Sequence, residues 1–199
     1  MAVSEATLRE NYRRMPDEKL LRLAADDANK LRPEALALLR AELSSRGLGA
    51  PAEKAIEAQQ QVLSEAGLQA YCAVVQAQPC PRCHATDQPL NATVVNKVAS
   101  FVVMTVWEKR FAIACPRCLD QLTHDATTSS GLLGWWGFPM GIVRTIQAII
   151  ANGKMAKNHH VGHPNDLLKA FVLTNAGRIE AARDNPADLQ WLLKGASRP

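Results

Sequence analysis

The sequence predicts an α+β protein: an N-terminal helical hairpin, then a β-hairpin module, then C-terminal amphipathic and short helices. Two observations carry this prediction. Apolar residues recur at helical spacing in the first third of the chain, and β-branched residues gather between two identical C-x-x-C pairs. With 199 residues, of which 47% are hydrophobic and 21% are charged, the composition is that of a globular chain with one domain or two small ones.

Three helices are expected before the first cysteine pair. Leucines and alanines recur at helical spacing over residues 17–31 and again from Pro33 onward. Pro33 suits a first helical position, and Gly47 suits the left-handed cap that ends a helix. A third helix is expected from Pro51 toward Val75, with a weak point at Gly67.

Strands are expected between the cysteine pairs. Residues 93–98 and 101–107 are rich in β-branched and aromatic side chains, which fit a pleated sheet better than a helix. The polar residues 108–110 interrupt this run before Phe111 leads to the second pair. We therefore expect two or three antiparallel strands.

The C-terminal third reads as loops and helices. Residues 124–131 (HDATTSSG) predict a polar loop, and an amphipathic helix follows that ends at Asn152-Gly153. Residues 154–163 predict a basic loop. Two short helices are expected to close the chain, one from Pro164 to about Asn175 and one from Pro186 to Lys194 that is capped by Asn185. The predicted domains are a helical module (1–65), a connecting helix (66–78), the β-hairpin module with the following segment (79–163), and the closing helices (164–199).

Four of the five cysteines form two matched CPRC pairs, Cys80/Cys83 and Cys115/Cys118. A C-x-x-C turn places two thiolates on one side of a tight knuckle. Two knuckles joined by a β-hairpin offer four sulfurs in the tetrahedral geometry that zinc accepts. We favour zinc over two disulfides or a redox-active pair, because identical pairs bracket strands instead of one pair opening a helix in a βαβ unit. Cys72 is expected to be a small buried hydrophobe.

Four cysteines complete a tetrahedral site and leave no position for a reacting water. We therefore expect the zinc to be structural and the protein to be non-enzymatic. A Cys₃His set that uses His84 or His124 is the less favoured alternative. The sequence contains no GxSxG, P-loop, GxGxxG or HExxH motif.

The two knuckles around strands look like a zinc ribbon. A zinc ribbon followed by GWWGFPMG (134–141) and an Ile-rich helix resembles a group of poorly characterised bacterial proteins that carry a zinc ribbon and a GWWG-x-P-x-G segment. The similarity covers residues 80–152, and the chain departs from the pattern with Met140, where the group is expected to have Trp. The resemblance implies a Cys₄ zinc-ribbon β-hairpin module, with zinc held by the four paired cysteines, and it implies no reaction.

Residues 132–150 are mostly apolar, but Arg144 and several glycines argue against a transmembrane helix. Two interpretations remain. In the favoured one the tryptophans cover the ribbon and the isoleucine face packs against the terminal helices. In the other, this segment lies at a membrane interface, with Lys154 and Lys157 near anionic headgroups. The residues of this predicted interaction surface are Trp135, Trp136, Phe138, Ile142, Ile146 and Ile149.

Three histidines, His159, His160 and His163, lie within five residues on the predicted basic loop. A second metal site or a phosphate-binding loop is one interpretation. A flexible surface loop is favoured, because the sequence places no carboxylate partner nearby.

The chain carries 23 Lys+Arg and 19 Asp+Glu, a formal net charge of +4 that is concentrated in the C-terminal third. This excess is too weak to indicate a nucleic-acid surface, although Arg82, Lys109, Arg110 and Arg117 could form one. The N-terminus lacks an apolar signal region, and the odd cysteine count favours reduced thiols, so we expect a cytoplasmic location.

Together these observations predict a non-enzymatic zinc-binding adaptor with an unidentified protein partner. The alternatives are a peripheral membrane protein that binds through the GWWG segment and, less favoured, a nucleic-acid-binding zinc ribbon.

Overall fold

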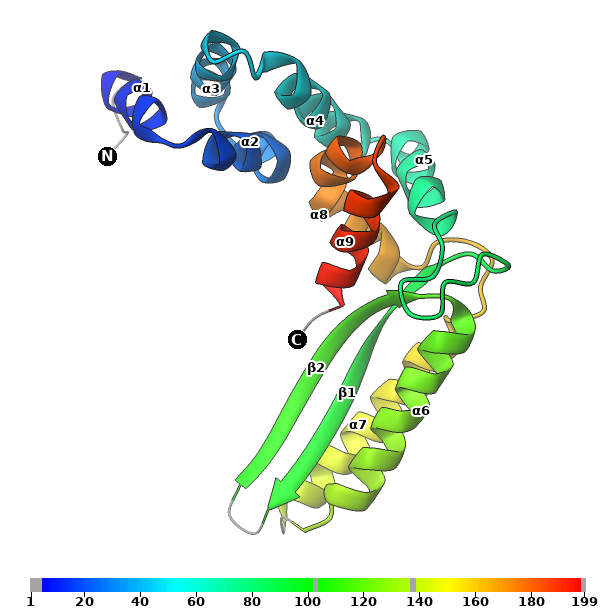
Figure 1. Cartoon of the computed structure of the whole chain (residues 1–199). Helices are drawn as coiled ribbons and strands as arrows, with labels where there is room; N and C mark the ends of the chain where they lie inside the picture. The colour runs from blue at the N-terminus through cyan, green and yellow to red at the C-terminus, as the bar shows by residue number, and fades with distance from the viewer. Residues whose placement is uncertain (1–4, 102–103, 137–138, 198–199) are drawn as a thin grey trace. The chain divides into compact units, whose positions relative to one another are not determined.

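A computed structural model describes residues 5–101, 104–136 and 139–197 (Figure 1). The chain is mixed α+β and mostly helical, with one antiparallel hairpin, as the sequence predicts. It divides into two compact units. The first holds the chain up to Tyr71 together with Ala170–Leu189, and the second holds Cys72–Lys169 together with the chain from Gln190 onward.

The first unit is built from helices. Its N-terminal part holds α1 (Glu5–Arg14), α2 (Asp17–Asp26), a 3-10 turn (Ala28–Lys30), α3 (Pro33–Ser45) and α4 (Gly49–Gln61). These helices share a core of fully buried side chains, among them Leu20, Leu39, Leu43 and Ile56. The predicted hairpin is confirmed: Pro33 opens α3, and Gly47 takes a positive φ of 74° just after its end.

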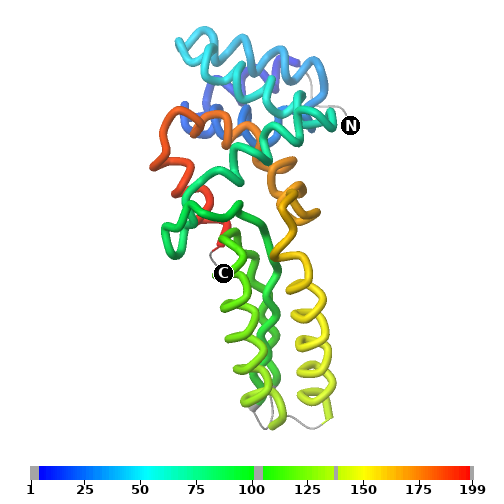
Figure 2. The backbone as a smooth tube through the Cα atoms, turned by 90° about the vertical axis from the view of Figure 1, so that its right-hand side faces the viewer, coloured from blue at the N-terminus to red at the C-terminus, as the bar shows by residue number. Residues whose placement is uncertain are grey.

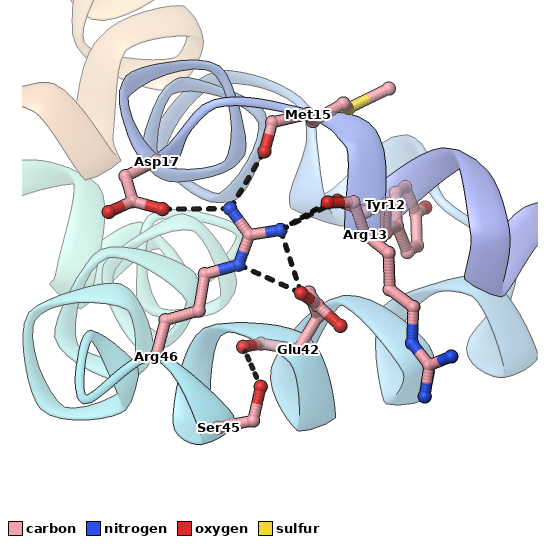
Figure 3. Close-up of polar contacts among 7 residues, drawn as sticks. All are labelled: Tyr12, Arg13, Met15, Asp17, Glu42, Ser45 and Arg46. Carbon is pink, nitrogen blue, oxygen red and sulfur yellow. Dashed lines mark hydrogen bonds and ion pairs between the residues drawn. The ribbon is translucent and has the colours of Figure 1, made fainter.

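The guanidinium of Arg46 joins three of these helices (Figure 3). It donates to the carbonyl oxygens of Tyr12, Arg13 and Met15 at the end of α1, at 2.7–3.1 Å. It also pairs with Asp17 at the start of α2 and with Glu42 in the last turn of α3, which Arg46 directly follows. The last carbonyls of a helix lack partners within the helix. The planar guanidinium of Arg46 therefore caps α1 and also links its end to the end of α3.

The expected third helix is in fact two helices. α4 ends at Gln61, and α5 runs from Glu65 to Gln76. The break falls at residues 62–64 and not at Gly67, which lies inside α5, where an added Cβ would meet the Gln61 carbonyl oxygen at 2.0 Å. Ser64 closes the break, because its hydroxyl accepts a hydrogen bond from the Gly67 amide.

The second unit contains a long hairpin and two long helices, which we call the arm. Strand β1 (Asn91–Phe101) pairs with β2 (Met104–Ala114), and α6 (Pro116–Leu133) and α7 (Met140–Ala156) both pack against β1 (Figure 2). Two expectations are wrong here. Residues 108–110 continue β2 without a break, and residues 124–131 lie inside α6 instead of forming a loop.

Helices α8 (Asp166–Ala182) and α9 (Pro186–Ala196) close the chain, and both are longer than expected. α8 has a kink at Asn175, which is where its predicted end lay. The Asn185 side chain accepts a hydrogen bond from the Ala187 amide, which confirms its predicted role as a cap. α7 likewise continues past Asn152-Gly153 to Ala156.

Candidate metal centre

The four paired cysteines come together in the second unit. Their sulfur atoms all lie within 4.8 Å of one another, and Cys83 Sγ lies 3.6 Å from Cys115 Sγ. Four sulfurs held tetrahedrally at about 2.3 Å from one ion lie about 3.8 Å apart, so this spacing fits a single metal ion. Among the described residues no other group of three or more ligating side chains is gathered in this way.

The first pair lies in the loop between α5 and β1. Its turn is closed by two backbone hydrogen bonds, from the His84 amide to the Cys80 carbonyl (2.9 Å) and from the Cys80 amide to the Ala85 carbonyl (2.8 Å). His84 takes the left-handed conformation, with a φ of 62°, that such a tight turn requires. The backbone therefore holds Cys80 and Cys83 on one side of the knuckle.

The second pair opens a helix. Cys115 follows β2 directly and occupies the N-cap position of α6, with Pro116 at the first helical position and Cys118 in the first turn. Proline at the first helical position is a helix-start signal, so Pro116 could have indicated from the sequence that a helix begins here. The second knuckle is thus a helix terminus and not a turn between strands.

Backbone amides are directed at the sulfurs. Burial opposes ionisation of the Cys80 thiol, but the N–H groups of Cys115, Cys83 and Arg82 outweigh it and lower its pKa to about 7. The Cys115 amide lies 3.3 Å from Cys80 Sγ. For Cys115 and Cys118, burial dominates and raises the pKa of each thiol. A bound cation would favour all four thiolates, because its charge replaces the lost solvation.

The donor set is closed and largely buried. Cys80, Cys115 and Cys118 are buried, while Cys83 lies at the surface. Neither His84 nor His124 belongs to the group of potential ligands in the described part of the chain. Cys72 is fully buried in α5, as expected.

A second polar cluster lies next to this centre and was missed from the sequence. His159 is fully buried, its Nδ1 donates to Asp120 Oδ1 at 2.8 Å, and its Nε2 lies 3.0 Å from Thr93 Oγ1. The exposed His160 donates to the other oxygen of the same carboxylate at 2.6 Å. The expectation of a flexible surface loop is therefore wrong for His159. The carboxylate partner, Asp120, is 39 residues away in sequence and is brought close only by the packing of α6.

The predicted interaction surface is mostly exposed. Trp135 and Trp136 are 47% and 71% exposed, Ile146 is also exposed, and Ile142 and Ile149 are half-buried. Phe138 lies outside the described residues. The favoured interpretation of this face as core is wrong. The side chains that α7 buries are small or polar, namely Gly141, Thr145, Ala148 and Asn152.

Tight packing explains why small residues form the buried face. A Cβ added at Gly134 would lie 1.8 Å from Thr145 Oγ1, and one added at Gly141 would lie 2.6 Å from the Gly134 carbonyl oxygen. The backbones of α6 and α7 therefore approach closely at their turn, and larger side chains fit only on the outside.

The four basic residues of the nucleic-acid hypothesis have different surroundings. Arg117 lies 3.6 Å from Asp87, Arg110 pairs with Glu108, and Lys109 lies over the ring of Trp107. Arg82 and Arg110 line a cavity of about 270 Å³ together with Lys97 and Lys194.

No helix in the described part of the chain is both long and apolar enough to cross a bilayer. Comparisons of the chain with protein-family models, with curated proteins and with solved structures gave no match.

Proposed function

We propose that the protein is a non-enzymatic, zinc-binding interaction protein whose metal is structural. The observation that carries this proposal is the gathering of four cysteine sulfurs within 4.8 Å, at the junction of a loop, a strand and a helix. Thiolates select soft or borderline ions, and a tetrahedral S₄ set is the usual ligand set of structural zinc.

The position of the centre supports a structural role. β1 and β2 pair so that Asn91 faces Ala114 at the end of the hairpin near the cysteines, and both CPRC pairs flank this end. An ion bound by all four thiolates would tie the loop before β1 to the first turn of α6. Its binding free energy would then contribute directly to the folding of the arm.

Our proposal includes a zinc-ribbon-like module that differs from a ribbon at its second knuckle. The two knuckles bracket a β-hairpin, as in a ribbon, but the second knuckle is the start of an 18-residue helix. The exposed apolar residues of the arm supply the interaction surface of an adaptor. A cytoplasmic location would keep the thiols reduced and available for metal.

Elemental analysis of the purified full chain tests the proposal. We expect about one zinc per chain, and loss of metal in Cys115→Ser, with loss of helicity and of thermal stability in the arm. Cys83→Ser is the second variant, because this exposed ligand can be replaced with less damage to the core. Cys72→Ala is the matched control, since it removes a buried thiol that lies outside the cluster.

Three outcomes would overturn the proposal: a chain without metal, a Cys115→Ser variant that keeps its zinc, or a Cys72→Ala variant that loses it. A nucleic-acid partner is the weaker alternative, because two of its four basic residues already face carboxylates. Binding to DNA or RNA that falls steeply with salt would favour it.

A further inference from the structure

The end of the arm opposite the cysteines is unusually apolar. Of the twelve large hydrophobic side chains that are exposed in the described residues, nine belong to the arm. Six of them lie at the end of α6, at the start of α7 or just after α6, at the end of the arm where β1 ends and β2 begins (Figure 1). We call this set the tip surface: Leu132, Leu133, Trp135, Trp136, Met140 and Val143.

The fold holds the two tryptophans outward. On the inner side, a Cβ added at Gly134 would meet Thr145 Oγ1 at 1.8 Å, which leaves no room there for a side chain, while Trp135 and Trp136 are exposed. The indole N–H of Trp136 donates to the Leu132 carbonyl oxygen at 3.2 Å. The indole N–H therefore keeps a hydrogen-bond partner when the ring leaves water. The Leu132 carbonyl at the end of α6 gains a partner as well.

The apolar surface continues along one side of α7. Val143, Ile146 and Ile150 are all exposed and recur at spacings of three and four residues, so they share a face of the helix. The opposite face is buried against β1 and α6. The exposed side of α7 is thus an apolar stripe that begins at the tip surface.

The charged residues within the sequence stretch that forms this surface are all basic, and the nearest carboxylate along the chain, Asp125, lies beside Leu132 and Leu133. No Asp or Glu occurs from residue 126 to residue 165, a stretch that includes the tip surface and all of α7. The same stretch carries Arg144, Lys154 and Lys157, and all three are exposed. Arg144 lies over the Trp107 ring, 4.8 Å from its centroid, and so stays on the arm. An anionic partner would complement this surface.

We propose that the tip surface and the α7 stripe dock the protein on the surface of an anionic lipid bilayer. This inference rests on the proposed function, since it names the partner of the interaction surface. The rings of Trp135 and Trp136 would enter the headgroup region, where amphipathic indoles are favoured, and Lys154 and Lys157 would lie near lipid phosphates. A protruding apolar tip needs no complementary groove in a fluid bilayer, whereas a protein partner would have to supply one.

Vesicle co-sedimentation of the full-length, zinc-loaded protein tests this proposal. The vesicles are phosphatidylcholine alone and phosphatidylcholine mixed with phosphatidylglycerol. We expect binding to the mixed vesicles that weakens with salt, and little binding to the neutral ones. Trp135→Ala/Trp136→Ala should lower the partition coefficient at least about tenfold. Lys154→Gln/Lys157→Gln should lower it by about fivefold per charge on the mixed vesicles only.

Trp191→Ala is the matched control, because Trp191 is 69% exposed but lies on α9, away from the tip surface. It should leave binding unchanged. Absence of binding to the mixed vesicles, or equal binding by the native protein and the double tryptophan variant, would overturn the proposal. A native dimer in sedimentation velocity that the double tryptophan variant loses would also overturn it, in favour of a second copy of the chain. Zinc content and circular dichroism of the same samples show separately whether the proposed function fails.

Discussion

The side chain of Asn152 on α7 pairs with the backbone of Asn96 on β1 as a neighbouring strand would. Its Oδ1 accepts from the Asn96 amide, and its Nδ2 donates to the Asn96 carbonyl oxygen, both at 2.8 Å. Nearby, Ser130 Oγ accepts from the Val98 amide, and Asn165 Nδ2 donates to the Ala92 carbonyl. Side chains thus satisfy the free edge of β1, which no third strand among the described residues covers.

Replacement of Asn152 tests this edge. Asn152→Ala removes both bonds and leaves a buried amide and a buried carbonyl of Asn96 without partners, so we expect a loss of about 2–4 kcal/mol in the free energy of unfolding. Urea denaturation followed by circular dichroism measures it. Asn158→Ala, at an exposed position six residues later, is the control, with an expected change within about 0.5 kcal/mol. Equal effects of the two substitutions would show that the edge pairing contributes little.

Replacement by alanine should change the free energy of unfolding in opposite directions at Gly134, the C-cap of α6, and at Gly131 inside that helix. Gly134→Ala forces a Cβ to within 1.8 Å of Thr145 Oγ1, and we expect a loss of about 1–3 kcal/mol as α6 and α7 separate. Gly131→Ala meets no atom within 4 Å inside a helix and should stabilise the protein by about 0.5–1 kcal/mol. Thermal melting of the two variants compares them. A Gly134→Ala variant as stable as the native chain would contradict the close approach of the two helices.

The neighbours His159 and His160 contact the same carboxylate but should differ in importance. His159→Ala leaves a cavity and unpaired polar groups around Thr93, and we expect a loss of about 2–4 kcal/mol. His160→Ala removes an exposed partner and should cost less than about 1 kcal/mol. The free energy of unfolding in urea at neutral pH measures both. If His160→Ala proves the more damaging change, the cluster is not held by its buried member.

Tyr71 gives the protein a pH dependence at high pH. Burial, followed by the hydrogen bond that its hydroxyl donates to Glu180 Oε2 at 2.9 Å, raises the pKa of Tyr71 to about 12. The stability contributed by this phenol is fully present below the unfolded pKa of about 10 and is lost as the pH rises through the folded value.

An absorbance titration at alkaline pH checks this shift. The sequence has only two tyrosines, so a Tyr12→Phe variant reports Tyr71 ionisation alone. We expect a midpoint close to 12 while the protein stays folded, and a midpoint near 10 would contradict it. Tyr71→Phe should lose the alkaline decline in stability and, below pH 10, cost about 0.5–1.5 kcal/mol for the missing hydrogen bond.

Local signals in the sequence predicted several elements well. Pro33, Gly47 and Asn185 mark helix ends through their own backbone or side-chain preferences, which act over a few residues. The four thiols of the paired CPRC motifs come together as expected, because local backbone geometry holds each pair, in a tight turn for the first and at a helix terminus for the second, and one hairpin joins the two.

Other elements could not be predicted from local preference. Residues 124–131 are rich in Thr and Ser and read as a loop, yet they lie inside α6, where Ala126 and Ser130 are buried. Contacts with β1 outweigh the weak helical propensity of those residues. Hydrophobicity also indicated the wrong face of α7, since burial there is limited by the closeness of two backbones.

The sequence alone determined the α+β class, the helical hairpin and the identity of the four candidate metal ligands. Only the tertiary structure decided that the second knuckle begins a helix, that Asp120 meets His159, and that the Trp135–Trp136 pair faces outward. The physical reason is the distance along the sequence over which each interaction acts. Caps and knuckles depend on neighbours along the chain, whereas burial of a helix face depends on what packs against it. For α7, the small or polar residues Gly141, Thr145, Ala148 and Asn152 are buried, whereas Ile146 and Ile150 are exposed and Ile142 and Ile149 are half-buried.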